Sequence, residues 1–128
     1  MDFPEELKYS KEHIWVRVEN GTAVIGITDF AQEELGLIAC VELPEEGDDL
    51  DQDDSFGTIE GRKTVSELYA PFSGTVEGVN QEVVDNPGLI NDDPYDSGWL
   101  LEVSLADIDD LKGLMSADDY ADYVETRD

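Results

Sequence analysis

The alternation of apolar and polar positions near the N-terminus predicts a β-hairpin. Runs rich in β-branched and aromatic residues occupy 13–18 and 22–27, and Asn20 and Gly21 lie between them. An Asn-Gly pair between two such runs is the strongest short-range signal for a tight turn joining antiparallel strands. We therefore expect these two runs to pair with each other.

The same kind of pattern continues along most of the chain. Short β-branched or apolar runs bounded by Gly, Pro, Asn or Ser predict further strands at 37–44, 55–61, 64–71, 72–80 and 99–105. We expect a charged loop at 45–54. The segment 81–98 is rich in Asn, Asp, Pro and Gly, and we expect 86–98 to be mostly loop.

Two segments carry helix signals instead. Residues 28–36 predict a short helix that Thr28 or Asp29 can cap. Residues 116–125 predict a second helix with Ser116 as its N-cap. Many short strands with few helices indicate a mainly β fold, either a sandwich of two sheets or a flattened barrel.

The composition narrows the possible partners. A length of 128 residues is typical of one domain, and a hydrophobic content of 40% is enough for a packed core. The chain has 33 acidic and seven basic residues, a formal net charge of −26. Such a surface repels nucleic-acid phosphates and anionic lipids, so we expect neither as a partner. Because the acids are spread along the whole chain, they favour the high-salt cytoplasm of a halophile over a local acidic tail.

The apolar runs, the first ten residues and the cysteine count indicate the cellular location of the protein. No apolar run is long enough to cross a bilayer, and the first ten residues lack the basic start and apolar core of a secretory signal. The single cysteine, Cys40, excludes an internal disulfide, which fits a reducing cytosol. We therefore expect a cytoplasmic protein.

The sequence contains few of the residue combinations that are typical of a catalytic site. The one histidine, His13, and the one cysteine, Cys40, could form a nucleophile–base pair on paper. Cys40 lies in an apolar run and is expected to be a small core residue. His13 is expected to be packed or exposed rather than to act as a base. No glycine-rich phosphate loop is present.

The acidic loop matches the spacing of a calcium-binding loop. The positions of the candidate ligands are Asp49, Asp51, Asp53, Ser55, Gly57 and Glu60. However, Asp54 stands where such a loop needs glycine for a sharp turn, and predicted strands rather than helices flank the segment. In so acidic a chain this spacing arises easily by chance, so we expect a solvated loop and no metal.

The adjacent pair Arg62 and Lys63 lies at the predicted turn between the strands 55–61 and 64–71. A lysine at a hairpin tip extends into solvent with no neighbour to constrain it, so a modifying enzyme can reach and acylate it. An amide would remove the charge and lengthen the side chain into a mobile arm. The alternative is an ordinary surface lysine, but the scarcity of lysine in this chain favours modification.

Six segments of the chain, in order, resemble one known family. They are YSKEHIWV, GITDFAQEELG, VELPEEGD, FGTIEGRKTVSELYAPFSG, VEGVNQEVVDNPGLINDDPYDSGWLLEV and SADDYADYVE. Together they resemble the H-protein family of the glycine cleavage system. The resemblance implies a lipoyl-domain-like fold (a barrel-sandwich hybrid) of two antiparallel sheets with a few short helices, including a C-terminal one. The single domain, 1–128, would have its core at about 9–105 and a helical extension at about 106–125.

The resemblance also implies a site. Lys63 falls on the family's lipoyl-lysine, so covalently attached lipoate is the expected cofactor. Glu60 and Gly74 fall on positions that help modifying enzymes to recognise the hairpin. Glu67 falls on an acid that lines a cleft for the loaded arm, and Glu12 stands where the family has a serine of that cleft.

Some positions depart from the family's pattern. The family usually has a glutamate between the His and the Trp near the start, where this chain has Ile14, and Glu12 could compensate for it. The family also usually has Ser-Val before the lysine and Ala after it, where this chain has Gly61, Arg62 and Thr64. These changes concern the docking of the arm more than its attachment.

The implied function is carriage rather than catalysis. The lipoyl arm would accept an aminomethyl group from glycine at glycine dehydrogenase (decarboxylating), deliver it to aminomethyltransferase and be reoxidised by dihydrolipoyl dehydrogenase. A lipoate ligase or lipoyl-transfer enzyme would attach the arm. We expect the carrier to be a monomer.

Two alternatives stay open. A lipoyl or biotinyl carrier domain of another complex would share the hairpin, although biotinyl domains usually have Met on both sides of the lysine, unlike Arg62 and Thr64. Neither kind of domain normally carries the helix at 28–36. An unmodified protein or a lipoate-relay scaffold would use the same fold without the carrier role.

Overall fold

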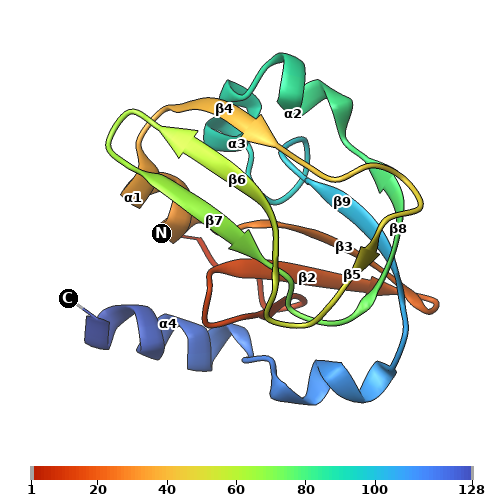
Figure 1. Ribbon diagram of the computed structural model, residues 1–128. Coiled ribbons are helices and arrows are strands. Elements are labelled where there is room, and N and C mark those ends of the chain that lie inside the picture. The colour runs from red at the N-terminus through yellow and green to blue at the C-terminus, as the bar shows by residue number, and fades with distance from the viewer. Residues whose placement is uncertain (1, 128) are drawn as a thin grey trace.

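The computed structural model describes residues 2–127, which form two antiparallel sheets and several short helices (Figure 1). The strands are β1 (Lys8–Tyr9), β2 (Ile14–Glu19), β3 (Thr22–Ile27), β4 (Ile38–Glu42), β5 (Asp49–Leu50), β6 (Ser55–Gly61), β7 (Val65–Tyr69), β8 (Gly74–Val79) and β9 (Leu101–Leu105). The helices are α1 (Asp29–Leu35), α2 (Gln81–Asp85), α3 (Gly88–Asp92), the 3₁₀ helix η1 (Ile108–Gly113) and α4 (Ala117–Arg127).

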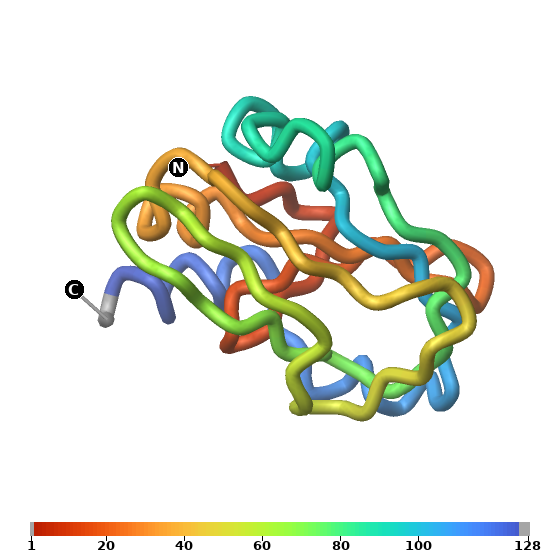
Figure 2. The backbone as a smooth tube through the Cα atoms, turned by 45° about the horizontal axis from the view of Figure 1, so that its top comes forward, coloured from red at the N-terminus to blue at the C-terminus, as the bar shows by residue number. Residues whose placement is uncertain are grey.

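The two sheets differ in size. The larger has the strand order β1-β2-β3-β9-β8-β5, and the smaller has the order β4-β6-β7. Every pair of neighbouring strands is antiparallel. Figure 2 shows the β6–β7 hairpin lying over the larger sheet, with its turn at one end of the molecule. The expected mainly β fold of two antiparallel sheets with a C-terminal helix is therefore confirmed, and the sheets do not close into a barrel.

The predicted N-terminal hairpin is confirmed. Strands β2 and β3 pair from Ile14 with Ile27 to Glu19 with Thr22. Asn20 and Gly21 form the turn with φ angles of 50° and 85°. Positive φ at both positions is what a tight type I′ turn requires and what an Asn-Gly pair tolerates.

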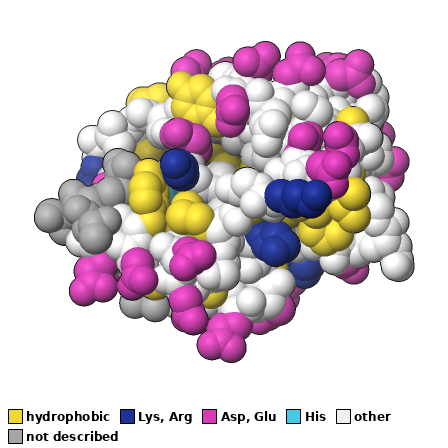
Figure 3. All heavy atoms as spheres, turned by 90° about the horizontal axis from the view of Figure 1, so that it is seen from below, with side chains coloured by type: hydrophobic (Ala, Val, Ile, Leu, Met, Phe, Trp, Pro, Cys, Tyr) yellow, Lys and Arg dark blue, Asp and Glu magenta, His cyan; other side chains and the backbone are white. Residues whose placement is uncertain are grey.

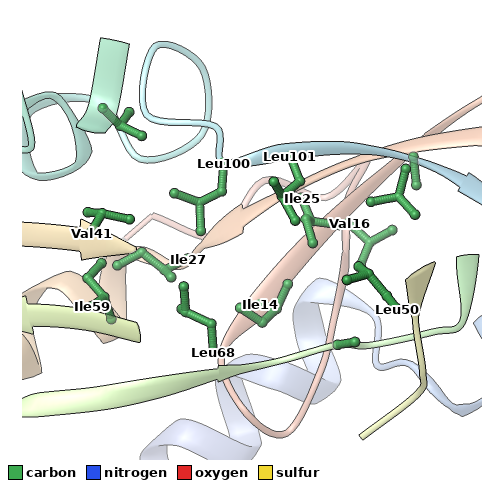
Figure 4. Close-up of a cluster of buried hydrophobic side chains, with 14 of the residues drawn as sticks. Ile14, Val16, Ile25, Ile27, Val41, Leu50, Ile59, Leu68, Leu100 and Leu101 are labelled. Atoms are coloured by element: carbon green, nitrogen blue, oxygen red, sulfur yellow. The ribbon is translucent and has the colours of Figure 1, made fainter. Parts of the chain in front are cut away.

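The main hydrophobic core fills the space between the two sheets (Figure 4). Alternate residues of β2 enter it, since Ile14 and Val16 are almost fully buried there. From the smaller sheet, Ile59 and Leu68 point toward them. Trp15 lies between the two β2 core residues in sequence and therefore points to the opposite face of the sheet.

A second cluster forms on that opposite face. Tyr9 and Tyr120 stack there with their ring centroids 4.8 Å apart, and Trp15 and Phe30 are buried in the same cluster. Tyr120 comes from α4, which runs along the lower side of the molecule in Figure 1. The C-terminal helix is thus held to the outer face of the larger sheet by aromatic packing.

The sequence did not predict α2 and α3. The segment 86–98, which was expected to be mostly loop, contains α3 and is otherwise irregular, and α2 lies directly before it. The Asn80 side chain caps α2 by accepting a hydrogen bond from the backbone N–H of Glu82 at 3.2 Å. Val83 and Ile90, one from each helix, are fully buried in the main core. Pro87 directly precedes α3 and Asn86 directly follows α2, so these residues mark helix ends rather than a continuous loop. Tertiary burial stabilises helices that are too short to form alone.

The short strands β1 and β5 were also missed. β1 adds to the edge of β2, and β5, inside the expected charged loop, pairs with β8 and buries Leu50. Two residues give no periodicity to detect, so only pairing with a partner strand defines them.

The expectation that Cys40 is a core residue is wrong, because Cys40 is exposed. It lies on β4, an edge strand whose pairing with β6 shifts register between Ile38 and Cys40. Ile38 and Val41 are buried, while Ala39 and Cys40 face outward. An apolar run does not reveal such a shift, which changes the face that each later side chain takes.

Candidate functional site

Lys63 lies in the turn between β6 and β7, as the sequence predicted, and its side chain is exposed. The backbone N–H of Gly61 donates to the carbonyl oxygen of Thr64 at 2.9 Å and closes the turn. Neither Arg62 nor Lys63 is among the residues with positive φ in the described chain. The backbone at both residues therefore avoids the left-handed region that is strained for an L-residue.

The turn is hydrogen-bonded to the end of α1. The backbone N–H of Lys63 donates to the carbonyl oxygen of Leu35 at 2.9 Å. The backbone N–H of Arg62 donates to the carbonyl oxygen of Leu37, two residues further on, at 3.0 Å. The final carbonyl groups of a helix have no partner within the helix, so the hairpin supplies donors that they need. The two segments also lie side by side in Figures 1 and 2.

The lysine side chain is less isolated than expected. Its Nζ donates to the carbonyl oxygen of Glu33 in α1 at 3.2 Å, and a Cβ placed on Gly36 would lie 3.0 Å from its Cγ. A helix C-terminus carries partial negative charge and attracts an ammonium group. The side chain therefore rests against α1 while its amine stays open to solvent.

Gly61 makes this close approach possible. It is buried, and a Cβ atom there would clash with the carbonyl oxygen and the side chain of Leu35. A residue with a side chain would have to push the hairpin away from α1. The glycine that departs from the family's usual serine is thus explained by packing in this chain.

A cleft of about 260 Å³ opens beside the hairpin, between α1, β7 and the residues that precede β2. Its lining residues are Glu12, His13, Ile27, Ala31, Glu34, Leu35, Ile59, Thr64, Val65, Ser66, Glu67 and Leu68. The structure therefore brings Glu12 and Glu67 to one cleft, although they are far apart in the sequence. Thr64, the residue after Lys63, also lines the cleft, so the lysine stands at its edge.

Tyr69 binds a carboxylate of this cleft from outside the lining, and the sequence did not indicate this role. Its hydroxyl donates to the Glu67 carboxylate at 2.9 Å. This hydrogen bond and the negative charge of Glu67 raise the pKa of Tyr69 above its ordinary value, with a smaller contribution from Glu12. The i, i+2 spacing of Glu67 and Tyr69 on one strand puts both side chains on the same face, which was the available signal.

Ile14 and His13 have structural roles. Ile14 is 1% exposed in the main core, so the position that departs from the family's glutamate supplies no polar group to the cleft. His13 has a φ angle of 69°, and its Nδ1 lies 2.7 Å from the Tyr120 hydroxyl. Its ring lies against Phe30.

His13 lines the cleft, whereas the exposed Cys40 does not. The structure therefore does not form the nucleophile–base pair of His13 and Cys40 that was considered from the sequence.

The two predicted recognition positions lie in different places. Glu60 is exposed at the end of β6, on the same hairpin as Lys63. Gly74 is buried in the larger sheet between β5 and β9, where a Cβ would clash with the carbonyl oxygen of Ser104. The close packing of strands accounts for the glycine at 74, and its role in recognition stays a prediction.

The described residues offer neither a metal site nor a membrane-spanning helix. Within residues 2–127, no three or more His, Cys, Asp or Glu side chains come together in a way that could hold a metal ion. No described helix is both long enough and apolar enough to cross a membrane.

Comparison with known proteins identifies the family. The model of the family described as glycine cleavage H-protein matches residues 7–127. The glycine cleavage system H protein of Salinibacter ruber is 55% identical over 95% of this chain and 98% of its own length, and that of Staphylococcus carnosus is 53% identical over 97% and 98%. The crystal structure of a glycine cleavage system H protein from Mycobacterium marinum superposes with a TM-score of 0.88 at 36% identity, covering 94% of this chain and 97% of that one. The chain therefore belongs to the glycine cleavage H-protein family.

Proposed function

We propose that Lys63 is the attachment site for the lipoyl group of this carrier. Proteins of the family are lipoyl carriers of the glycine cleavage system and hold lipoate on a lysine. The observation that carries the assignment is the place of Lys63, exposed in a hairpin turn that is hydrogen-bonded to α1 and stands at the edge of an acidic cleft. An amide on Nζ replaces only the hydrogen bond to Glu33, so nothing in the fold obstructs the modification.

The residues around the hairpin fit such a group. When attached, lipoate supplies a disulfide that takes up the aminomethyl group of glycine and is reduced in doing so. Glu12 and Glu67 can accept hydrogen bonds from a primary amine in the cleft, and Tyr69 orients the Glu67 carboxylate. Ile27 and Leu35 contribute apolar walls to the same cleft.

The partners follow from this role. They are glycine dehydrogenase (decarboxylating), aminomethyltransferase and dihydrolipoyl dehydrogenase, with a lipoate ligase or lipoyl-transfer enzyme that recognises the hairpin through Glu60. The carrier itself performs no catalysis in this scheme. It acts as a monomer in the cytoplasm and, because of its negative charge, binds neither nucleic acid nor anionic membranes. The domain is the whole chain, 1–128, with its core at about 9–105 and the helical extension at about 106–125.

Mass spectrometry tests the assignment of Lys63. Protein purified from its native host should carry one lipoyl group, located on a peptide that contains Lys63. The variant Lys63→Arg should carry none and should not support glycine cleavage, whereas Lys11→Arg and Lys112→Arg should behave like the wild type. A lipoyl group on another lysine, a biotin group, or full glycine cleavage by Lys63→Arg would overturn the assignment.

The acidic surface fits a high-salt cytoplasm, as in a halophile. Figure 3 shows Asp and Glu side chains distributed over the face of the molecule that α4 occupies, where they outnumber the Lys and Arg side chains, some of which lie together. Repulsion between these carboxylates destabilises the fold until salt screens it. The melting temperature should therefore rise steadily between 0.1 M and 2 M KCl. A melting temperature that does not depend on salt would contradict this origin.

A further inference from the structure

Exposed apolar side chains gather next to Lys63. In the described part of the chain, the large hydrophobic residues that remain exposed are Val18, Leu37, Val65 and Ile108. Leu37 is 49% exposed and Val65 is 61% exposed. The carbonyl oxygen of Leu37 accepts the backbone hydrogen bond of Arg62, and Val65 is the second residue after Lys63. Two of the four therefore lie at the tip of this hairpin.

Arg62 adds a charge to the same place. Its side chain is exposed, and within residues 2–127 its guanidinium makes no hydrogen bond or ion pair, although the chain has 33 acidic residues. By contrast, Arg17 pairs with Glu19, and Lys112 pairs with Asp109. An unpaired guanidinium is suited to bind a carboxylate through two parallel hydrogen bonds.

We propose that Leu37, Arg62 and Val65, named here the tip patch, form the docking surface for the enzyme that attaches the lipoyl group. The proposal rests on Lys63 being the attachment site. The complementary surface of that enzyme carries an apolar rim and a carboxylate that binds Arg62. Exposed apolar groups around a modification site mark a surface that a partner covers.

The chemistry of attachment indicates that the enzyme that attaches the lipoyl group, rather than an enzyme that acts on the finished arm, covers the tip patch. The Nζ atom of Lys63 attacks the acyl carbon of activated lipoate, an acyl adenylate. The amide C–N bond forms, the C–O bond to phosphate breaks and AMP leaves, while the two protons lost by the ammonium group pass to a base and to solvent. Because the reacting atom belongs to Lys63 itself, the enzyme must cover the residues beside it. Enzymes that act on the sulfur atoms at the far end of the arm need not do so.

Leu37 joins the patch only in the folded protein. It directly precedes β4, and the pairing of β4 with β6, which places Ile38 opposite Gly61, brings the backbone of Leu37 to that of Arg62. An enzyme that contacts Leu37 together with Arg62 therefore recognises two chain segments that meet only when β4 has paired with the hairpin.

Rates of lipoylation in vitro test the proposal. Unmodified wild-type protein and the variants Leu37→Ser, Arg62→Ala and Val65→Ser are incubated with lipoate, ATP and the host's lipoate ligase, and the lipoyl group on Lys63 is followed by mass spectrometry. Each variant should lower kcat/KM by about tenfold, the loss typical of a central interface residue. The controls Val18→Ser and Ile108→Ser also remove exposed apolar groups, but away from the hairpin, and Lys8→Ala removes an exposed charge. They should change the rate less than twofold.

A slower lipoylation rate could also result from misfolding, and the charge reversal Arg62→Glu tests for this. It alters an exposed side chain and leaves the backbone hydrogen bond to Leu37 in place. It should slow lipoylation more than Arg62→Ala, and the difference should shrink at high salt. Wild-type rates for the three patch variants, or equal losses in the controls, would overturn the tip patch while leaving Lys63 as the attachment site. A change in oligomeric state without a change in lipoylation rate would assign the patch to a second copy and overturn it as well. If the wild type gains no lipoyl group on Lys63, the assignment of Lys63 fails and the tip patch fails with it.

Discussion

The backbone N–H of Lys63 donates a hydrogen bond to the carbonyl oxygen of Leu35, the last residue of helix α1, at 2.9 Å. Each group satisfies the other, since the carbonyl groups at the helix end lack donors and the backbone N–H of the turn needs an acceptor. The lysine is therefore presented on a turn that is attached to a helix rather than on a free loop. Five predictions test this arrangement and the packing of the rest of the fold.

The substitution Gly61→Ala should destabilise the fold by about 1–3 kcal/mol, because the added methyl group collides with the carbonyl oxygen of Leu35. Urea unfolding measures the loss. Gly113→Ala is a matched control, since a Cβ there meets no atom within 4 Å. If both variants unfold at the wild-type urea concentration, the close packing of the hairpin on α1 is not required for stability.

The substitutions Glu67→Gln and Glu12→Gln should each speed the loss of the aminomethyl group from the loaded protein about two- to fivefold. Removing a carboxylate weakens a partly exposed hydrogen bond to an amine by about 0.5–1 kcal/mol. The release of ammonia from the isolated loaded carrier gives the rate. Glu77→Gln, an exposed glutamate on β8, should leave it unchanged.

The same variants should alter the titration of Tyr69. Glu67 accepts the Tyr69 hydrogen bond and raises its pKa, so Glu67→Gln should lower the pKa of this hydroxyl toward its ordinary value. A difference in phenolate absorbance between wild type and Tyr69→Phe follows this group alone. An unchanged titration curve would show that Glu67 and Tyr69 do not interact in solution.

Stability should fall as the pH rises above about 10, the ordinary pKa of tyrosine. Burial, as the largest cause, raises the pKa of both Tyr9 and Tyr95 in the folded state. The unfolded chain therefore loses protons first, and the stabilisation present below pH 10 is lost as the pH climbs toward the raised values. Urea unfolding at pH 8 to 11 should show this slope, and Tyr9→Phe should reduce it. A stability that is flat over this range would contradict the prediction.

The substitution Thr28→Val should cost about 1–2 kcal/mol. The Thr28 hydroxyl is buried, accepts from the backbone N–H of Ala31 at 3.2 Å as the N-cap of α1, and lies 2.7 Å from the Tyr120 hydroxyl. Thermal or urea unfolding measures the loss, with Thr75→Val as control because that hydroxyl bonds only an exposed aspartate on a strand. Equal stabilities would show that α1 does not depend on its cap.

Local signals in the sequence predicted the elements whose ends are defined by nearby residues. The Asn20–Gly21 turn, the α1 helix with its Thr28 cap and the β6–β7 hairpin all appear as expected. Ser116 also accepts the hydrogen bond of Asp119 at the start of α4. Each of these depends on backbone preferences or on hydrogen bonds within a few residues, so the sequence contains the whole signal.

The elements that sequence reasoning missed depend on contacts across the fold. Residues 81–98 contain two helices because Val83 and Ile90 are buried by distant strands. Cys40 is exposed because the register of β4 on β6 shifts. Neither the burial nor the register is visible in the local pattern, because each is decided by the partner surface.

For the functional site, the sequence by itself determined that Lys63 stands next to Arg62 in a tight hairpin turn of a very acidic chain. Only the tertiary structure decided what surrounds that lysine. It placed the end of α1 and Leu37 against the turn, and it brought Glu12 to the same cleft as Glu67. The physical reason is that a turn is specified by neighbouring residues, whereas a cleft or a docking surface is formed by segments that meet only when the core packs.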